Sequence, residues 1–363
     1  MSPSAPPETT LAAVHGVLAP HRYPQEQITE AFAAMCLGSE PSTKQAAIRR
    51  LHTNTRVATR HLALPLERYA TLADFTEAND AFIEIGTDLA AQAVTEALAQ
   101  AGIDPAEVDM VMSTTVTGIA VPSLEARIAG RVGFRPDVKR MPLFGLGCLA
   151  GAAGVARLHD YLVGHPDEVA VLVSVELCSL TVQRGDQSMA NLVSSGLFGD
   201  GGAAVVAVGA ERARRTGVSG PVVLDSRSHL YPDTGRTMGW DVGSGGLRIV
   251  LGADIPTLVT RYLGVDVKQF LADHSLDVRD VGAWVSHPGG PKVIQAIEAE
   301  IGAEPDALAV TWASLAEVGN LSSASVLHVL RDTLRDHRPE PGTPGVMMAM
   351  GPGFCAELVL LRW

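Results

Sequence analysis

The sequence has few cysteines and more acidic than basic residues. Its 363 residues include 4 cysteines, with no CxxC pair and no Cys/His set at zinc spacing, so the pattern predicts neither a disulfide framework nor a metal site. The 28 Lys and Arg against 40 Asp and Glu give a net charge of -12. That balance argues against nucleic acid or an anionic membrane as a partner of the whole surface.

Long hydrophobic runs are also missing. Apolar stretches such as VAVLVSVELCSL, from Val169, reach a Glu or a Gly before the roughly 20 residues that a membrane-spanning helix needs. The amino-terminal MSPSAPPETT has neither the positive charge nor the apolar segment of a signal peptide. We therefore expect a cytoplasmic protein with no membrane span.

The sequence does contain a regular alternation of helix-like and strand-like segments, which is typical of α/β proteins. In the first part, helices are predicted at 88–102 and 149–163 and strands at 109–117, 139–145 and 169–175. After Gly220, strands are predicted at 246–251, 282–286, 345–350 and 356–363 and helices at 255–274, 291–302 and 322–337. We expect a parallel sheet with helices on both faces, and two α/β halves, 1–220 and 221–363.

A single cysteine, Cys148, lies among glycines in FGLGCLAG, at the junction of a predicted strand and a predicted helix. The free N–H groups and the positive end of that helix would stabilise a thiolate. Glycines at 145, 147 and 151 would allow a tight turn and the close approach of a substrate. Free cysteine is also among the residue types most often buried, so Cys148 is either an inert core residue or a nucleophile.

Two other polar residues occupy similar junctions. His287, in WVSHPGGPKVIQ, ends a predicted strand, and Asn320, in EVGNLSSAS, precedes a predicted helix. A Cys, His and Asn set suits a papain-like hydrolase, but the chain lacks the CG[SA]C[WY] signature of that class. It also suits a decarboxylating condensing enzyme, in which the Cys carries an acyl thioester and the His and Asn stabilise an enolate.

The motifs GLGCLAGAAGVAR, SSGLFGDGGAAVV, WVSHPGGPKVIQ, EVGNLSSASVL and GVMMAMGPGF occur in that order. Together they resemble the type III polyketide synthases, the chalcone and stilbene synthase-like acyltransferases. The resemblance implies a thiolase-like αβαβα five-layer fold of two pseudo-symmetric halves, the first with the nucleophile Cys148 and the second with the decarboxylation pair His287 and Asn320. It also implies that Phe198, in LFGDG, is the gatekeeper ring between a CoA tunnel and an elongation cavity.

CoA binding is predicted in a basic stretch and a glycine pair. The segment KQAAIRRLHTNTRVATRHL, from Lys44, has no acidic residue, so it is either a phosphate site or a solvated helix face. By resemblance, Arg50 contacts the CoA phosphate with help from Arg49 and Arg56, although Asn54 replaces one basic residue of the family. Gly289 and Gly290 would let the pantetheine arm pass close to the backbone.

The predicted cavity is apolar and aliphatic. Its expected lining is Val116, Thr117, Val121, Ile249, Ser322 and Met350, of which Ile249 and Met350 replace aromatic residues of the family and the segment with Val121 reaches the subunit interface. This lining resembles alkylresorcinol and alkylpyrone synthases more than naphthalene-forming enzymes, and it implies a fatty acyl-CoA starter extended by malonyl-CoA or methylmalonyl-CoA. The resemblance implies CoA thioesters as substrates and no cofactor. It also implies a homodimer.

Two alternatives remain open. One is a β-ketoacyl carrier-protein synthase III-like enzyme that performs one condensation, and the other is a non-catalytic thiolase-fold protein that binds acyl-CoA. Starter length, number of extensions, choice of extender and lactone or aldol cyclisation are not predicted. Glu176 and Asp200 are interpreted as buried hydrogen-bonding residues near the site.

Overall fold

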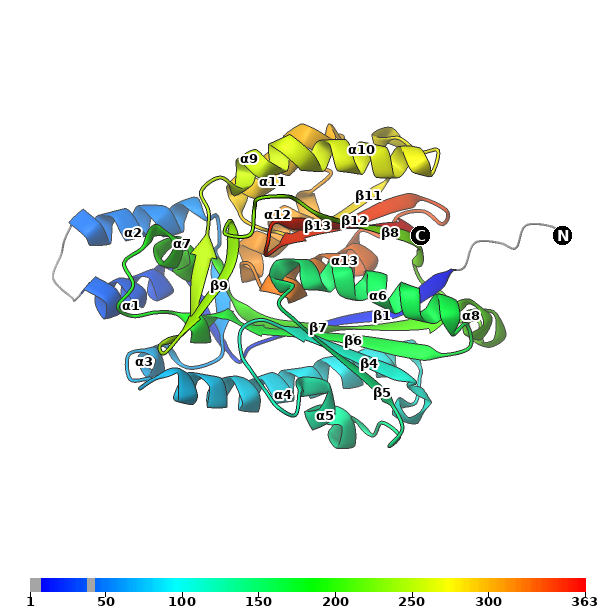
Figure 1. Cartoon of the computed structure of the whole chain (residues 1–363), viewed down its shortest axis with the longest axis horizontal. Helices are drawn as coiled ribbons and strands as arrows, with labels where there is room; N and C mark the ends of the chain where they lie inside the picture. Colours follow the sequence, from blue (N-terminus) through cyan, green and yellow to red (C-terminus); the bar gives the residue numbers. More distant parts are fainter. Residues whose placement is uncertain (1–7, 38–42) are drawn as a thin grey trace.

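Five layers of alternating helix and sheet form the structure, a computed structural model that describes residues 8–37 and 43–363 (Figure 1). Helices α4 (Phe75–Ala101) and α5 (Leu124–Val132) cover one outer face. Helices α6 (Ala150–Gly164) and α13 (Ser325–Asp336) lie in the middle layer, and α10 (Gly264–Asp273) and α11 (Pro291–Ile301) cover the other outer face. The predicted αβαβα fold is therefore confirmed.

Nine strands form one continuous mixed sheet in the order β11-β12-β13-β8-β1-β7-β6-β4-β5. Its two halves, β11 to β8 and β1 to β5, form the two sheet layers on either side of α6 and α13 (Figure 1). Their bounds are β1 Thr9–Leu18, β4 Met110–Thr115, β5 Lys139–Phe144, β6 Val169–Leu177, β7 Asp200–Gly209, β8 Val222–Leu230, β11 Ala283–Ser286, β12 Pro344–Gly351 and β13 Cys355–Arg362. Strand β4 is parallel to β5 and β6, and β11 to β12, whereas the other neighbours are antiparallel. The prediction of a parallel sheet is correct for these pairs and wrong for the rest, because β1, β7, β8 and β13 run against their neighbours.

The two halves of the chain meet where β1 and β8 pair through two residues, Thr9 with Val223 and Thr10 with Val222. Residue 220 lies between α8 (Ala210–Thr216) and β8. The division at that residue remains a prediction, since the sheet continues across it.

Local sequence explains the main elements. Helix α4 begins where the Asp74 carboxylate accepts the N–H groups of Thr76 and Glu77, and it ends at Gly102, whose φ of 65° is left-handed. Every residue of β6 and β7 is buried, which accounts for their continuous apolar runs. Helix α6 is rich in Ala and Gly because it is packed between the two halves of the sheet and against α13.

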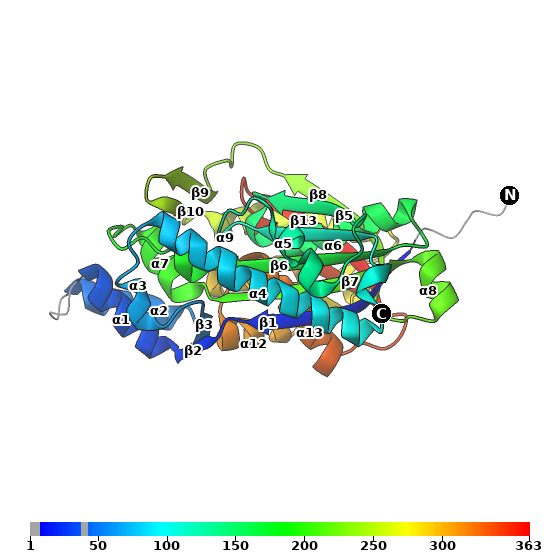
Figure 2. The ribbon, with the colours of Figure 1, turned by 90° about the horizontal axis from the view of Figure 1, so that it is seen from below.

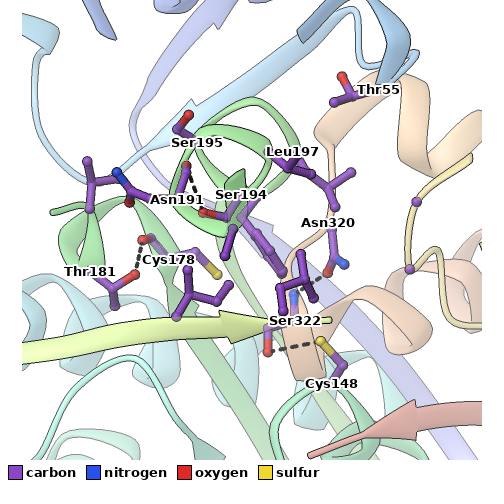
Figure 3. A pocket seen from close by; sticks show the side chains of 18 of the residues that line it. Thr55, Cys148, Cys178, Thr181, Asn191, Ser194, Ser195, Leu197, Asn320 and Ser322 are labelled. Carbon is purple, nitrogen blue, oxygen red and sulfur yellow. Dashed lines mark hydrogen bonds between the residues drawn. The ribbon is translucent and has the colours of Figure 1, made fainter. Parts of the chain in front are cut away.

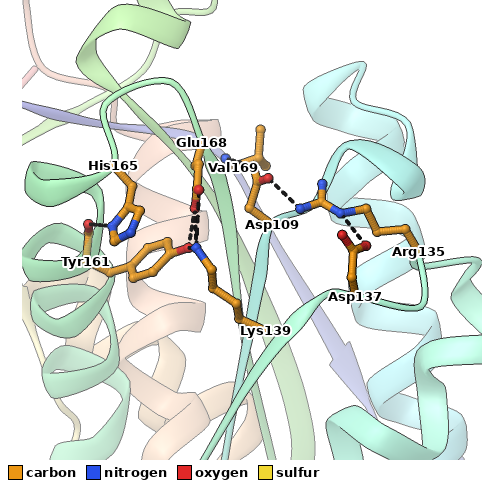
Figure 4. A network of polar contacts seen from close by, with 8 residues as sticks. All are labelled: Asp109, Arg135, Asp137, Lys139, Tyr161, His165, Glu168 and Val169. Carbon is orange, nitrogen blue, oxygen red and sulfur yellow. Dashed lines mark hydrogen bonds and ion pairs between the residues drawn. The ribbon is translucent and has the colours of Figure 1, made fainter.

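A polar network fixes the starts of β5 and β6, at the end of the sheet that lies away from Cys148 (Figure 4). The Asp109 carboxylate accepts the Val169 N–H and the Arg135 guanidinium, each at 2.8 Å. Lys139, the first residue of β5, donates to the Tyr161 hydroxyl at 2.6 Å and pairs with Glu168 at 3.1 Å. The starts of β5 and β6 are thus tied to α6.

Smaller elements gather beyond the other end of the sheet, seen from below in Figure 2. They are the strand pairs β2 (His21–Pro24) with β3 (Thr59–Leu62) and β9 (Met238–Gly243) with β10 (Gly246–Leu251), and the helices α1 (Gln25–Leu37), α2 (Thr43–Asn54), α3 (Leu66–Tyr69), α7 (Met189–Leu197) and α9 (Ile255–Leu258). Helix α12 (Ala309–Val318) packs beside α13 and β11 and also contacts β3. Strand β10 was predicted, but it pairs only with β9. Within the described ranges, no helix combines the length and apolarity needed to cross a bilayer.

Candidate active site

Three turns from distant parts of the chain converge on one pocket with a cavity volume of about 550 Å³. Cys148 lies in a 3₁₀ turn, Gly147–Leu149, directly before α6. His287 follows β11, and Asn320 follows α12. All three side chains line the cavity, so the structure brings the predicted set together.

The Asn320 amide is held in one orientation. Its Oδ1 accepts the Ser322 N–H at 2.8 Å and the Ser325 hydroxyl at 3.3 Å. Its Nδ2 therefore faces the His287 ring, 3.4 Å from Nε2. An amide N–H and an imidazole side by side can both point toward one oxygen atom of a substrate.

The Cys148 thiol lies beside this pair, with Sγ 3.7 Å from the Ser322 hydroxyl oxygen (Figure 3). Burial raises the pKa of Cys148 to about 12, and the hydrogen bonds to Ser322 and Asn320 act in the opposite direction. Burial also lowers the pKa of His287 to about 3. The helix terminus was expected to lower the pKa of the Cys148 thiol. With His287 uncharged this expectation is wrong, because burial of the thiol raises its pKa by more than the helix terminus lowers it.

Transfer of the proton from Cys148 to His287 would place opposite charges close together, and each stabilises the other. We therefore predict that His287→Ala moves the pH of half-maximal Cys148 alkylation by iodoacetamide upward by about one to three units. Peptide mass spectrometry measures alkylation site by site. His165→Ala, at the far end of α6, is the control, and an unmoved midpoint in His287→Ala would show that the imidazole does not assist the thiol.

The predicted lining is largely in place. Phe198, Val116, Thr117, Ile249, Ser322 and Met350 line the cavity, and so do Gly289 and Gly290. Val121 does not line it: its side chain is 88% exposed on the loop before α5. The prediction that Val121 lines the cavity is therefore wrong for the cavity that this single chain forms.

The predicted CoA-binding arginines lie outside the lining. Arg49 makes a two-pronged ion pair with Glu30, at 2.6 and 2.7 Å. Arg56 lies over the Trp312 ring, 4.9 Å from its centroid, and Arg50 is exposed on α2. The exposed cation on the rim of the cavity is instead Lys292, which the sequence analysis missed although it directly follows the Gly-Gly-Pro turn.

Other lining residues were missed as well. Trp240 of β9 pairs across the hairpin with Ile249, and both line the cavity. Cys178 and Thr181 lie on the far wall from Cys148 in Figure 3. No local signal identified these residues, since their place depends on how the hairpin and the turn after β6 pack.

Glu176 and Asp200 are buried and fully engaged. Glu176 Oε2 accepts the Thr117 hydroxyl at 2.9 Å and the Val116 N–H at 3.1 Å, while Oε1 accepts the Ser323 hydroxyl. Asp200 accepts the N–H groups of Ser179 and Ala63. These bonds agree with the structural interpretation of both acids.

Comparisons with known proteins now decide the family. Residues 40–219 match the family model of the FAE1/Type III polyketide synthase-like protein, and residues 223–363 match the C-terminal domain of the chalcone and stilbene synthases. The chain belongs to the type III polyketide synthases. Polyketide synthase activity of the acyltransferase class is therefore supported, as the sequence predicted.

Two relatives and one solved structure locate the chain within the type III polyketide synthases. A 1,3,6,8-tetrahydroxynaphthalene synthase of Streptomyces peucetius is 56% identical over 98% of this chain and 93% of its own length. An alpha-pyrone synthesis polyketide synthase-like protein of Mycobacterium tuberculosis is 29% identical, with 99% and 92% covered. The tetrahydroxynaphthalene synthase structure from Streptomyces coelicolor superposes with a TM-score of 0.90 at 29% identity, with 98% and 99% covered. The predicted likeness to alkylpyrone synthases over naphthalene-forming ones is thus not supported.

Proposed function

We propose that this type III polyketide synthase extends an acyl group on Cys148 by decarboxylative condensation with malonyl-CoA. The observation that carries the proposal is the convergence of Cys148, His287 and Asn320 on one cavity. The Cys148 thiolate takes the acyl group from its CoA thioester, and CoA leaves. Malonyl-CoA then loses CO2, and the resulting carbanion attacks the acyl thioester, which releases the thiolate and leaves a β-ketoacyl-CoA for the next round.

The charges in the pocket suit this sequence. A carboxylate in an apolar cavity is poorly solvated, which favours its loss as CO2. His287 Nε2 and Asn320 Nδ2 lie 3.4 Å apart and can donate to the enolate oxygen, with Asn320 uncharged. A carboxylate at position 320 would repel that oxygen instead.

We propose malonyl-CoA as both starter and extender, with a tetrahydroxynaphthalene-type product. The support is the 56% identity over 98% of the chain to a protein named for that product. A homodimer fits the same family. Its contact would involve the edge strand β5, beside which Ile119, Val121, Met141 and Phe144 are exposed apolar side chains.

A second candidate is the fatty acyl-CoA starter with alkylresorcinol or alkylpyrone products. The observation that favours it is the apolar part of the cavity lining that α1 and α7 supply, called here the apolar arm: Ile28, Phe32, Met35, Met189 and Val193. No charged side chain belongs to this set, so an alkyl chain would lose little solvation there.

The exposed residues around the cavity are polar in one part of its rim and apolar in another. Asn54 and Lys292 are exposed where α2 and α11 begin or end, and a cation there suits CoA phosphates. Ala70 and Met189 are exposed beyond the apolar arm, and Met189 is 59% exposed. A polar head and an apolar tail of one substrate could thus lie toward different parts of the rim.

The deciding experiment incubates the purified protein with labelled malonyl-CoA alone and with acyl-CoAs of graded length, followed by mass analysis of products. Aromatic product from malonyl-CoA alone supports the first candidate, and preference for long acyl-CoAs supports the second. Extension only with malonyl on a carrier protein would favour a β-ketoacyl carrier-protein synthase III-like enzyme. Binding of acyl-CoA without any acylation of Cys148 would favour a non-catalytic protein.

The Trp240 side chain is predicted to limit product length. Trp240 lines the cavity, and its cross-strand partner on β10, Ile249, has no ring. Trp240→Ala should therefore enlarge the cavity and shift products toward longer chains. Product masses measure the shift. Val242→Ala, on the same strand but 69% exposed, should leave the distribution unchanged, and an unchanged distribution in Trp240→Ala would contradict the prediction.

A further inference from the structure

Arg60, on β3, is a charged side chain in an unusual place. It is 2% exposed and lies at the wall of the cavity. The buried Asp200 carboxylate is near enough to stabilise its charge, although the two form no salt bridge within the described ranges. Burial of a guanidinium without a directly contacting carboxylate costs stability. The chain therefore keeps Arg60 at this position at a cost, and its contacts suggest why.

The contacts of Arg60 converge on the end of α7. Its Nη1 donates to the Phe198 carbonyl at 2.7 Å, and its Nε donates to Oε1 of Gln25 at 2.9 Å. Gln25 in turn donates from Nε2 to the Gly196 carbonyl at 2.7 Å. Carbonyls in the last turn of a helix lack partners within the helix, and a cation at that end stabilises them.

The same segment is bound to the Asn320 backbone. The Asn320 N–H donates to the Leu197 carbonyl at 2.9 Å, and the Gly199 N–H donates to the Asn320 carbonyl at 2.9 Å. These two bonds flank Phe198 and form a β-bridge between Phe198 and Asn320. The position of the Asn320 backbone therefore follows that of residues 197–199.

Gly319 allows the close contact between the turn before Asn320 and the end of α7. Its φ is 74°, and a Cβ there would lie 2.7 Å from the Leu197 carbonyl oxygen and 3.2 Å from the Arg60 Cδ. Arg60, the end of α7 and the turn before Asn320 thus pack directly on one another. No room remains for one of them to shift without the others.

We propose that Arg60, supported by Gln25, is a positioning residue for decarboxylation: it fixes the end of α7 and, through the bridge to Phe198, the Asn320 amide beside His287. The inference deepens the proposed function and rests on the role assigned there to Asn320. Arg60 does not itself touch the reacting atoms. Its Nη2 is buried and has no hydrogen-bond partner in the described part of the chain, so that group offers no exposed surface to a substrate.

The test is a double-mutant cycle on the full-length protein, read out as acetyl-CoA release from malonyl-CoA. We expect Arg60→Lys to lower kcat roughly tenfold with little change in KM, because Lys lacks the rigid fork from which Nη1 and Nε reach Phe198 and Gln25. In the Asn320→Ala background the same change should cost less than about twofold. Arg22→Lys, on the neighbouring strand β2, is the matched control and should leave kcat unchanged.

Each other outcome is informative. An equal loss in both backgrounds would mean that Arg60 supports only the fold, and a raised KM with unchanged kcat would mean that it binds substrate; both overturn the inference. A loss with Asn320→Ala but none with Arg60→Lys overturns this inference alone. No loss with Asn320→Ala overturns the proposed role of Asn320 as well. If Arg60→Lys is insoluble, Gln25→Met replaces it in the same cycle, with an expected loss of about threefold.

Discussion

Replacing Cys148 by alanine is expected to end polyketide formation while decarboxylation of malonyl-CoA continues. Without Sγ there is no atom to hold the acyl group, and removal of a covalent nucleophile costs on the order of 10⁴-fold or more. His287 and Asn320 remain 3.4 Å apart, so the enolate can still form and pick up a proton. Product mass and acetyl-CoA release are measured on the same samples.

Cys36→Ala provides a thiol control for that experiment. Cys36 is a half-buried thiol on α1 that does not line the cavity. Its replacement should leave product formation intact, and intact-mass analysis with an acyl-CoA should show one acyl group per chain that is absent from Cys148→Ala. Polyketide formation at the wild-type rate by Cys148→Ala would refute the assignment of the nucleophile.

The second large effect is expected at Asn320. Asn320→Ala should lower kcat for malonyl-CoA decarboxylation by roughly 100-fold to 1000-fold, the usual cost of removing one oxyanion donor. Asn320→Asp should be at least as damaging, since a carboxylate would face the developing negative charge. Acylation of Cys148 by a starter should continue in both variants, because that step does not use the enolate.

Ser325→Ala separates position from chemistry at the same residue. The Ser325 hydroxyl donates to Asn320 Oδ1 at 3.3 Å, whereas the Ser322 N–H holds that oxygen at 2.8 Å. We expect Ser325→Ala to lower kcat for decarboxylation only a few-fold, about the effect of one neutral hydrogen bond.

Unchanged acetyl-CoA release by the Asn320→Ala variant would show that the amide takes no part in decarboxylation.

Local signals in the sequence were sufficient for several elements. Strand β6 is a continuous apolar run and was predicted from its own residues. For helix α4 the end at Gly102 was predicted, but the predicted start at 88 is wrong, since the helix begins at Phe75 after the cap Asp74. The turns that carry Cys148, His287 and Asn320 each have neighbouring glycines. Their convergence was predicted from the resemblance to the type III polyketide synthases, and for His287 also from its position at the carboxyl end of a strand.

Other features depend on partners far away in the sequence. Strand β1 starts at Thr9, where no strand was predicted, and its pairing with β7 joins residues about 200 positions apart, which no local pattern encodes. The basic stretch from Lys44 was treated as one surface. In the structure Arg49 pairs with Glu30, Arg56 lies over Trp312 and Arg60 is buried, because each meets a different partner.

The pKa of Cys148 is a further example. The sequence predicted the helix that follows the thiol, but it did not predict which distant segments pack around the turn that carries the thiol. A Cβ at Gly147 would lie 2.6 Å from Cδ of Pro352, so that loop packs directly against the turn. Burial by distant residues thus reversed the sign of a shift that the local dipole alone suggested.

The β-bridge between Phe198 and Asn320 has a practical consequence for redesign. Helix α7 supplies Met189 and Val193 to the wall of the apolar arm and leads, without interruption, into that bridge. Substitutions chosen on this helix to reshape product size are therefore expected also to shift the Asn320 amide. Libraries that vary the β9–β10 hairpin instead should alter selectivity with less loss of turnover.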